Sequence, residues 1–199
     1  MGSDSQPELA PYDSETKTLG KPVARVVSEF ADGQAPMTVQ TGPNVKLEQV
    51  PVTGRESETL ASPKMRALSQ FYRALNNRDL ALMARNWAQT DEAVMDNPVG
   101  GIKRGWPAIR AVYERVFSRA PSFWFEFYDY SLHEAGDVFY VAGRERGEYA
   151  SNQGTLALSI RTSRIFRLID GEWRQIHHHG SIDDADLLRG YQRAVFEDR

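Results

Sequence analysis

The sequence contains no cysteine among its 199 residues, which excludes disulfide bonds, cysteine-ligated metals and thiol nucleophiles. No apolar run approaches the roughly 20 residues that cross a bilayer, and residues 1–5 have neither the basic nor the apolar region of a signal peptide. A basic surplus is also missing, because 24 Lys and Arg stand against 27 Asp and Glu. This balance argues against nucleic-acid binding driven by bulk charge. We therefore expect a cytoplasmic protein that binds neither nucleic acid nor membranes.

Aromatic residues are scarce in the first 63 residues, which hold 2 of the 21 aromatics but 7 of the 10 prolines, with 9 acidic against 5 basic residues. Such a segment buries too little apolar area to offset the entropy of ordering it. We predict an irregular, Pro-rich, acidic extension over 1–62 and one folded domain over 63–199. Two short alternations, 37–40 and 45–52, resemble a loose hairpin that would lie on the domain or on a neighbouring subunit.

In the first half of the domain the apolar residues recur at helical spacing, which predicts helices. Ser62 followed by Pro63 is typical of a helix N-cap and first turn. A short strand near 93–98 precedes the last of the helices, which is expected to stop before Pro121. The predicted helices span about 63–77, 80–87 and 105–120.

After Pro121 the hydrophobic period changes from 3.6 to 2, which is typical of strands. Asp170-Gly171 is a strong two-residue hairpin signal, and Asp183-Asp184 is expected to begin a terminal helix. Three helices followed by an antiparallel meander form an α+β pattern. Long twisted strands with helices laid across one face leave a conical cavity. The predicted strands are 122–133, 138–150, 155–169 and 173–181.

Several motifs carry a resemblance to a known family. Residues 96–100 (DNPVG), followed by 104–106 (RGW) at the start of a helix, resemble the nuclear-transport-factor-2-like superfamily, which includes ketosteroid isomerases and SnoaL-like cyclases. Residues 170–181 (DGEWRQIHHHGS) are similar to a signature of the calcium/calmodulin-dependent kinase II association domain and its stand-alone bacterial relatives, and 163–166 (SRIF) resemble a second one. The resemblance covers about 64–185. It implies a cystatin-like roll, in which helices wrap a cone-shaped sheet, and dimerisation through that sheet.

Strand alternation predicts which side chains face the inside of the cone. With Asp170-Gly171 as the hairpin loop, Arg164 is expected opposite His177 and Thr162 opposite His179. These four share the more apolar face with Phe166, so we expect them inside.

Glu145 joins that interior face when the alternation is carried to the preceding strand. It stands where the kinase association domain is expected to have an arginine, so an arginine-rich pocket is not implied. Buried ionisable groups must be paired, neutral or functional. A Glu145–Arg164 pair satisfies this requirement and can be purely structural. His178, on the alternate face, is predicted to be exposed or at a subunit contact.

A binding hypothesis makes this cluster the anchor for an apolar small molecule. Arg164 would bind a carboxylate or enolate oxygen, and aromatic walls would hold the apolar body. The candidate ligand-binding residues are Arg164, His177, His179, Thr162, Tyr72, Trp87 and Phe166.

A catalytic hypothesis adds a base near the cavity mouth. Asp96 or Glu145 would transfer a proton next to a carbonyl, with a His or Tyr as electrophilic partner. The resemblance implies such isomerase or cyclase chemistry, although no residue matches those catalytic motifs closely. Asp96, two residues before Pro98, can equally cap a turn.

A metal site is the third alternative, since His177 and His179 with Glu145 make a two-histidine, one-carboxylate set. Arg164 between them would repel a cation, and we expect no metal and no cofactor. A non-catalytic oligomerisation module also remains open. We expect a homodimer through the outer sheet face, which carries Arg144, Arg146, Arg161, Ser163 and Ile165.

Overall fold

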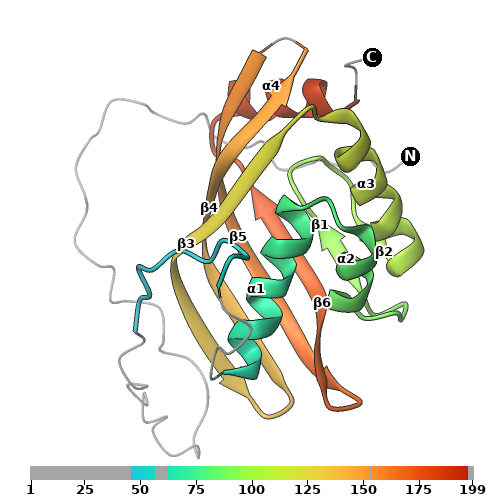
Figure 1. Ribbon diagram of the computed structural model, residues 1–199, viewed down its shortest axis with the longest axis vertical. Coiled ribbons are helices and arrows are strands. Elements are labelled where there is room, and N and C mark those ends of the chain that lie inside the picture. Colours follow the sequence, from blue (N-terminus) through green and yellow to red (C-terminus); the bar gives the residue numbers. More distant parts are fainter. Residues whose placement is uncertain (1–45, 57–61, 153, 197–199) are drawn as a thin grey trace, which may run out of the picture. The chain divides into compact units, whose positions relative to one another are not determined.

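Four helices and six strands follow one another along residues 46–56, 62–152 and 154–196, which the computed structural model describes. Their order is that predicted from the change of hydrophobic period, and their bounds differ from the predicted ones by a few residues (Figure 1). One two-residue strand was not predicted. The elements are α1 (Pro63–Asn76), α2 (Leu80–Asn86), β1 (Val94–Asp96), β2 (Lys103–Arg104), α3 (Trp106–Arg119), β3 (Phe123–Ala135), β4 (Val138–Ser151), β5 (Gly154–Ile169), β6 (Glu172–Ser181) and α4 (Ala185–Phe196).

Local chemistry sets the ends of these elements. The Ser62 side chain accepts from the Met65 N–H at the start of α1, and the Asp79 carboxylate accepts from the Leu82 N–H, 2.8 Å away, at the start of α2. Each cap satisfies an N–H that has no partner within its helix. Asp170 and Gly171 both have positive φ, 50° and 80°, as a tight hairpin turn with right-handed strand twist requires.

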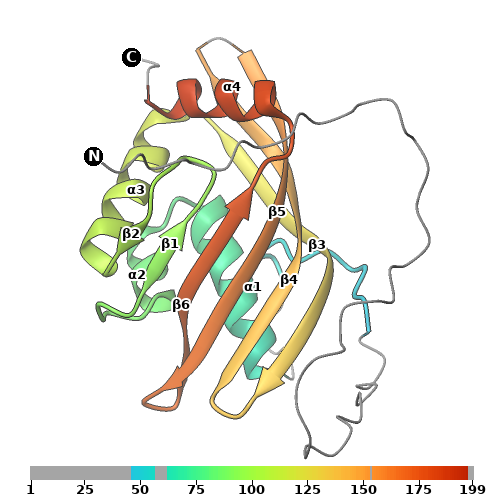
Figure 2. The ribbon, with the colours of Figure 1, turned by 180° about the vertical axis from the view of Figure 1, so that it is seen from behind.

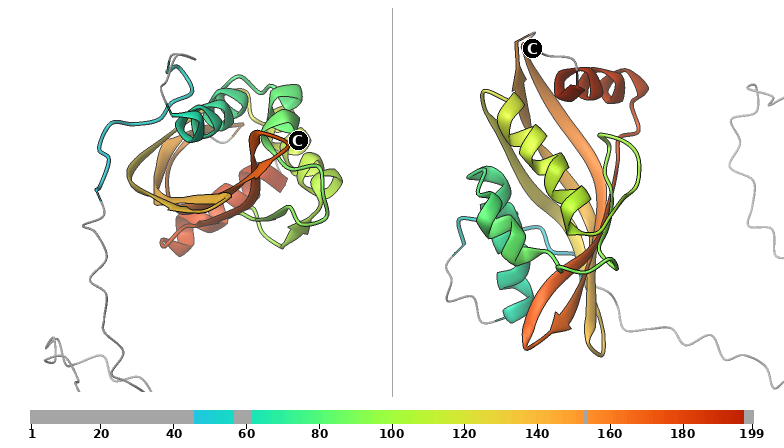
Figure 3. Two further views of the ribbon diagram at one scale, coloured as in Figure 1. Left: turned by 90° about the horizontal axis from the view of Figure 1, so that it is seen from below. Right: turned by 90° about the vertical axis from the view of Figure 1, so that its right-hand side faces the viewer.

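The strands form one curved sheet in the order β2-β1-β6-β5-β4-β3. β3 to β6 are antiparallel, and β1 extends the sheet by pairing with β6 in the parallel direction. Helices α1, α2 and α3 lie on one face of the sheet (Figures 1 and 3), while no helix of the described chain crosses the middle of the opposite face (Figure 2). The predicted α+β class and cystatin-like roll are confirmed.

Aromatic side chains fill the space between the helices and the inner face of the sheet. Phe71 and Tyr72 of α1 pack edge to face, and Tyr72 stacks on Phe127 of β3 with ring centroids 5.9 Å apart. Phe139 and Phe166 stack between β4 and β5 at 4.6 Å. Burial of such rings contributes much of the hydrophobic stabilisation of a domain. No helix within the described ranges is long and apolar enough to span a membrane.

The β5–β6 hairpin departs from the predicted register at a bulge. Pairing follows the prediction from the turn to Phe166 opposite Gln175, and then Ile165 lies opposite His177, so that Ile176 is the extra residue. Because side chains alternate, one extra residue exchanges the two faces for the rest of the strand. The predicted pairing of Arg164 with His177 and of Thr162 with His179 is therefore wrong. The partners are His178 for Arg164 and Gly180 for Thr162.

A segment of the predicted extension, residues 46–56, lies along β3. Glu48 exchanges backbone hydrogen bonds with Tyr130, and Val52 does so with Phe127, over 2.7 to 3.1 Å. Val52 is 3% exposed. The alternation predicted for 45–52 thus pairs with the folded domain from residue 46 onward. The alternation at 37–40 and the turn after it lie outside the described residues.

Candidate functional site

A buried ion pair occupies the centre of the interior. Arg164 Nη2 of β5 donates to Glu145 Oε1 of β4 over 2.6 Å, and their side chains are 1% and 5% exposed. Tyr72 of α1 donates its hydroxyl to the same carboxylate oxygen, also over 2.6 Å. Burial raises the pKa of Tyr72 well above its ordinary value, so the phenol remains a donor. The predicted Glu145–Arg164 pair is present, and Tyr72 completes it.

Arg164 also contacts two other residues, Phe71 and Gln175. Its guanidinium carbon lies 3.5 Å from the centroid of the Phe71 ring, a close cation–π contact. Its Nη1 donates to Gln175 Oε1 over 3.1 Å. Burial opposes the charge of Arg164, but the neighbouring Tyr72 and Glu145 raise its pKa above the ordinary value. Arg164 is therefore a fixed buried cation.

Several buried polar atoms near Arg164 have no hydrogen-bond partner among the described residues: Trp87 Nε1, Tyr113 Oη, Gln175 Nε2 and His178 Nδ1. Buried polar groups are nearly always hydrogen-bonded in folded proteins. A group of such atoms in one region therefore indicates a place for a further polar molecule, such as water or a ligand.

Tyr113 and Trp87 are held close together in this region. Burial raises the pKa of Tyr113 to about 12, against the opposing charge of Arg164 and the nearby indole N–H of Trp87. The Tyr113 ring also lies 6.4 Å from that of Phe71, centroid to centroid, and Phe71 covers Arg164. The phenol therefore keeps its proton and can donate.

His178, predicted to be exposed or at a subunit contact, is 6% exposed and faces the interior. Its ring lies 6.3 Å from Phe71, and its Nε2 is 3.0 Å from Thr162 Oγ1. Thr162 in turn donates to the backbone oxygen of His179 over 2.8 Å. Burial first, and then the charge of Arg164, lower the pKa of His178 well below its ordinary value. His178 is neutral at physiological pH.

His177 and His179 lie on the outer face, where they meet Asp96 of β1. Asp96 Oδ2 is 2.9 Å from His179 Nδ1, and Asp96 Oδ1 is 3.8 Å from His177 Nε2. The prediction that both histidines face the interior is wrong because the bulge exchanges the faces of β6. Glu145 lies on the opposite face, so it is far from the other candidate base, Asp96, and does not form the two-histidine, one-carboxylate set with His177 and His179. No cluster suited to metal binding occurs in the described part of the chain.

The aromatic residues predicted as ligand walls, Tyr72, Trp87 and Phe166, are completely buried in the packed interior. A pocket of about 660 Å³ lies instead between α1, α2 and the β5–β6 turn. A second, about 520 Å³, lies on the outer sheet face beside Arg144 and His179. Neither is lined by the buried ion pair.

Sequence reasoning missed four residues of the buried cluster. Two carried a usable signal, since Tyr113 lies on the apolar stripe of its helix and Gln175 alternates with the interior positions of β6. His178 was assigned to the wrong face. Phe71 carried no such signal, because its contact with Arg164 depends on how α1 crosses the sheet.

The sequence and the fold are similar to those of known proteins. The family model of the SnoaL-like domain matches residues 65–185. A comparison with curated proteins finds no match.

Three solved structures illustrate the likeness of the fold. A putative dehydratase of the NTF2-like family from Streptomyces avermitilis is 15% identical with a TM-score of 0.57, over 63% of this chain and 97% of that one. A putative calcium/calmodulin-dependent protein kinase type II association domain from Thiobacillus denitrificans is 22% identical with a TM-score of 0.54, over 62% and 96%. An uncharacterised protein with a cystatin-like fold from Caulobacter vibrioides is 16% identical with a TM-score of 0.54, over 64% and 92%.

Proposed function

The chain belongs to the SnoaL-like domain family, and from that premise we propose that it binds a small apolar molecule through a carbonyl or carboxylate oxygen inside the domain. The observation that supports this proposal is the set of buried donors without acceptors beside Arg164, namely Trp87 Nε1, Gln175 Nε2 and the Tyr113 hydroxyl. Because these groups can donate, they call for a ligand that offers an oxygen acceptor, which is the chemical class proposed for the physiological ligand.

The unpartnered atoms of this cluster lack a hydrogen-bond acceptor. An indole N–H can only donate. The amide oxygen of Gln175 faces the guanidinium of Arg164, which has no acceptor, so the amide nitrogen of Gln175 must be the unpartnered end. Two of the atoms are thus obligatory donors, and an oxygen acceptor satisfies both. The adjacent positive charge favours an acceptor that carries negative charge.

Access to this position requires a local movement. Trp87, Gln175 and Arg164 are each 1% exposed or less, so a ligand reaches them only when side chains of the helical layer shift. The surrounding rings would then hold the apolar body of the ligand.

Binding is better supported than catalysis. An isomerase or cyclase mechanism needs a carboxylate base and its electrophilic partner around one substrate. Asp96 lies on the outer face beside His179, and the Oε1 atom of Glu145 already accepts from both Arg164 and Tyr72. Catalysis by Asp96 or Glu145 therefore has no direct support from the geometry.

Thermal-shift measurements with small aromatic and aliphatic carboxylates and ketones test the binding proposal. Compounds that stabilise the wild-type protein should lose at least half of their effect in Trp87→Phe and in Gln175→Leu. Trp124→Phe is the matched control, because Trp124 also has a buried indole N–H without a partner among the described residues but lies on β3. Equal stabilisation of all variants would contradict the proposal.

Self-association through the outer sheet face is a second proposal. This face is uncovered by helices in its middle (Figure 2), and it carries the exposed Arg144, Arg146 and Arg161 together with Tyr140. The similarity to a putative kinase association domain favours assembly. Light scattering at tens of micromolar should give the mass of a dimer, and a charge reversal at Arg161 should lower it. A monomeric mass would remove this proposal.

A cytoplasmic location stays a prediction from the sequence.

A further inference from the structure

We propose that the buried cluster beside Arg164 binds a carboxylate together with one proton, which comes from the solvent and is held between a ligand oxygen and His178 Nδ1. The site is that of the proposed function, on which this inference rests, and the ligand class narrows from carbonyls and carboxylates to carboxylic acids bound with their proton. The atom that requires the proton is His178 Nδ1, which is buried and has no hydrogen-bond partner among the described residues.

The hydrogen bonds of Thr162 determine which nitrogen of His178 carries its proton. A backbone oxygen can only accept, so the 2.8 Å contact between Thr162 Oγ1 and the oxygen of His179 uses the single hydroxyl proton of Thr162. Thr162 Oγ1 must then accept from His178 Nε2, which is 3.0 Å away. Burial and the charge of Arg164 lower the pKa of His178 and keep its ring neutral, so the ring has only one N–H. His178 Nδ1 is therefore an acceptor without a donor.

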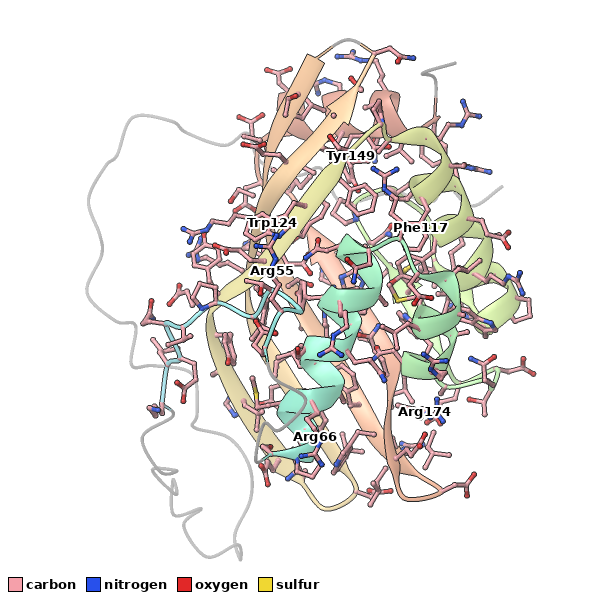
Figure 4. All side chains as sticks on the ribbon, viewed as in Figure 1. Arg55, Arg66, Phe117, Trp124, Tyr149 and Arg174 are labelled. Carbon is pink, nitrogen blue, oxygen red and sulfur yellow. The ribbon has the colours of Figure 1, made fainter. Side chains whose placement is uncertain are left out.

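His178 lies beside the donors of the cluster. It is opposite Arg164 in the β5–β6 ladder, and its ring centroid is 6.3 Å from that of Phe71, the ring that covers the Arg164 guanidinium. The Tyr113 ring is 6.4 Å from the same ring, and the Gln175 amide accepts from Arg164. All of these side chains are buried in the layer between the helices and the sheet, where Figure 4 shows side chains packed together. The cluster thus combines obligatory donors with one obligatory acceptor.

A ligand that offers only acceptor oxygens does not satisfy this combination. The carbonyl of a ketone accepts from the donors and leaves His178 Nδ1 without a partner, and a carboxylate oxygen set against Nδ1 brings two acceptors together. A carboxyl group with one proton satisfies both sides, because one oxygen accepts while the other shares its proton with Nδ1. The same hydrogen bond joins the oxygen and Nδ1 whichever of the two atoms holds the proton more closely.

Charge balance gives a second reason for the proton. Arg164 is a buried cation, but Glu145 already balances its charge over 2.6 Å. A carboxylate added to this neutral pair would leave one buried negative charge without a counter-charge, which is costly. Uptake of one proton from the solvent cancels that charge.

Other titratable groups surround His178 without taking its place. Burial raises the pKa of Tyr72 and of Tyr113, so both phenols already hold their protons. The carboxylate and the two histidines of the outer face contact one another on the far side of the sheet from the cluster. The charged and titratable groups around His178 are Arg164 of β5, Glu145 of β4, Tyr72 of α1, Tyr113 of α3, Asp96 of β1, and His177 and His179 of β6.

Isothermal titration calorimetry of the full chain with benzoate, in two buffers of different ionisation enthalpy at pH 7.5, counts the protons taken up on binding. We expect an uptake of about one proton per benzoate, and an affinity that falls about tenfold for each unit of pH above 7. Acetophenone has the same ring and a carbonyl but no titratable group. It should bind without proton uptake and with an affinity that does not depend on pH.

His178→Phe keeps a buried ring and removes both nitrogens. It should weaken benzoate at pH 7 about tenfold through the lost hydrogen bond and abolish the proton uptake, while the affinity for acetophenone stays close to that of the wild type. His133→Gln, on β3, is the matched control and should keep the uptake of one proton. Thermal melts show whether each variant is folded.

The outcomes separate this inference from the proposed function. Binding of benzoate without proton uptake, or binding of acetophenone alone, would overturn the inference and leave the proposed function standing. No binding of either probe at millimolar concentration would overturn both. Unchanged proton uptake in a folded His178→Phe would assign the proton to another group and overturn the role of His178. The proton count of the wild-type protein needs no variant, so it decides the matter even if His178→Phe does not fold.

Discussion

Glu145 and Arg164 form an ion pair across neighbouring strands, with Nη2 and Oε1 2.6 Å apart in the interior of the domain. They are not direct partners in the ladder, since Glu145 lies opposite Ile160 and Arg164 opposite Val141. The pair is thus diagonal, and Tyr72 of α1 binds the same carboxylate oxygen from above the sheet. Helix α1 and two strands therefore meet at one carboxylate.

Removal of one partner of this pair should be costly. Arg164→Met leaves Glu145 buried without its counter-charge, for which we expect a loss of about 3–5 kcal/mol in the free energy of unfolding. Urea denaturation followed by circular dichroism measures it. The double variant Glu145→Gln/Arg164→Met should recover part of the loss, because no charge is then left buried. Arg144→Met, on the outer face, is the control and should cost about 1 kcal/mol or less. A loss that small for Arg164→Met would mean that the pair is not buried as described.

The buried His178 should make stability depend on pH below neutrality. Its folded-state pKa is lowered from 6.5, chiefly by burial, so below about pH 6.5 the unfolded chain takes up a proton that the folded protein does not. The contribution of neutral His178 to the free energy of unfolding is fully present above about pH 6.5. It falls on acidification by up to about 1.4 kcal/mol per pH unit until the folded pKa is reached.

The test compares urea midpoints between pH 7.5 and 5 in two histidine variants. His178→Gln should reduce the slope of the free energy of unfolding against pH by the contribution of one proton. His133→Gln, whose histidine stacks on the exposed Tyr140, should keep the wild-type slope. Identical slopes in wild type and His178→Gln would show that His178 is accessible to protons in the folded state.

Two glycine substitutions should act in opposite directions. Gly54 has φ of +83°, and a Cβ there would lie 2.2 Å from the backbone nitrogen of Arg73, so Gly54→Ala should separate the 46–56 segment from α1 at a cost of about 1–3 kcal/mol. Gly190, within α4, would meet only Leu156 at 3.8 Å, and Gly190→Ala should stabilise the protein by about 0.5–1 kcal/mol through helix propensity. Thermal or urea denaturation gives both values. A neutral Gly54→Ala would indicate that the segment does not contact α1 in solution.

Part of the candidate site can be predicted from local sequence patterns, that is, from the alternation of side chains along each strand. Alternation along β4 and β5 correctly places Glu145 and Arg164 inside, because the ladder between these strands contains no bulge. The same rule fails for the three histidines of β6, where one inserted residue reverses the faces. Nothing in the hydrophobic period of 173–181 distinguishes the two possibilities, since both faces carry a histidine in either register.

What the sequence by itself determined is therefore the set of local structures: the Ser62 and Asp79 caps, the Asp170-Gly171 turn, and the period that separates helices from strands. These depend on residues within one turn or one hairpin of each other. The tertiary structure decided the bulge at Ile176, next to Gln175, whose backbone oxygen accepts from the Ala88 N–H beyond the end of α2. It also decided which donors remain without acceptors. Both depend on contacts between elements far apart in the chain, and no local pattern encodes such contacts.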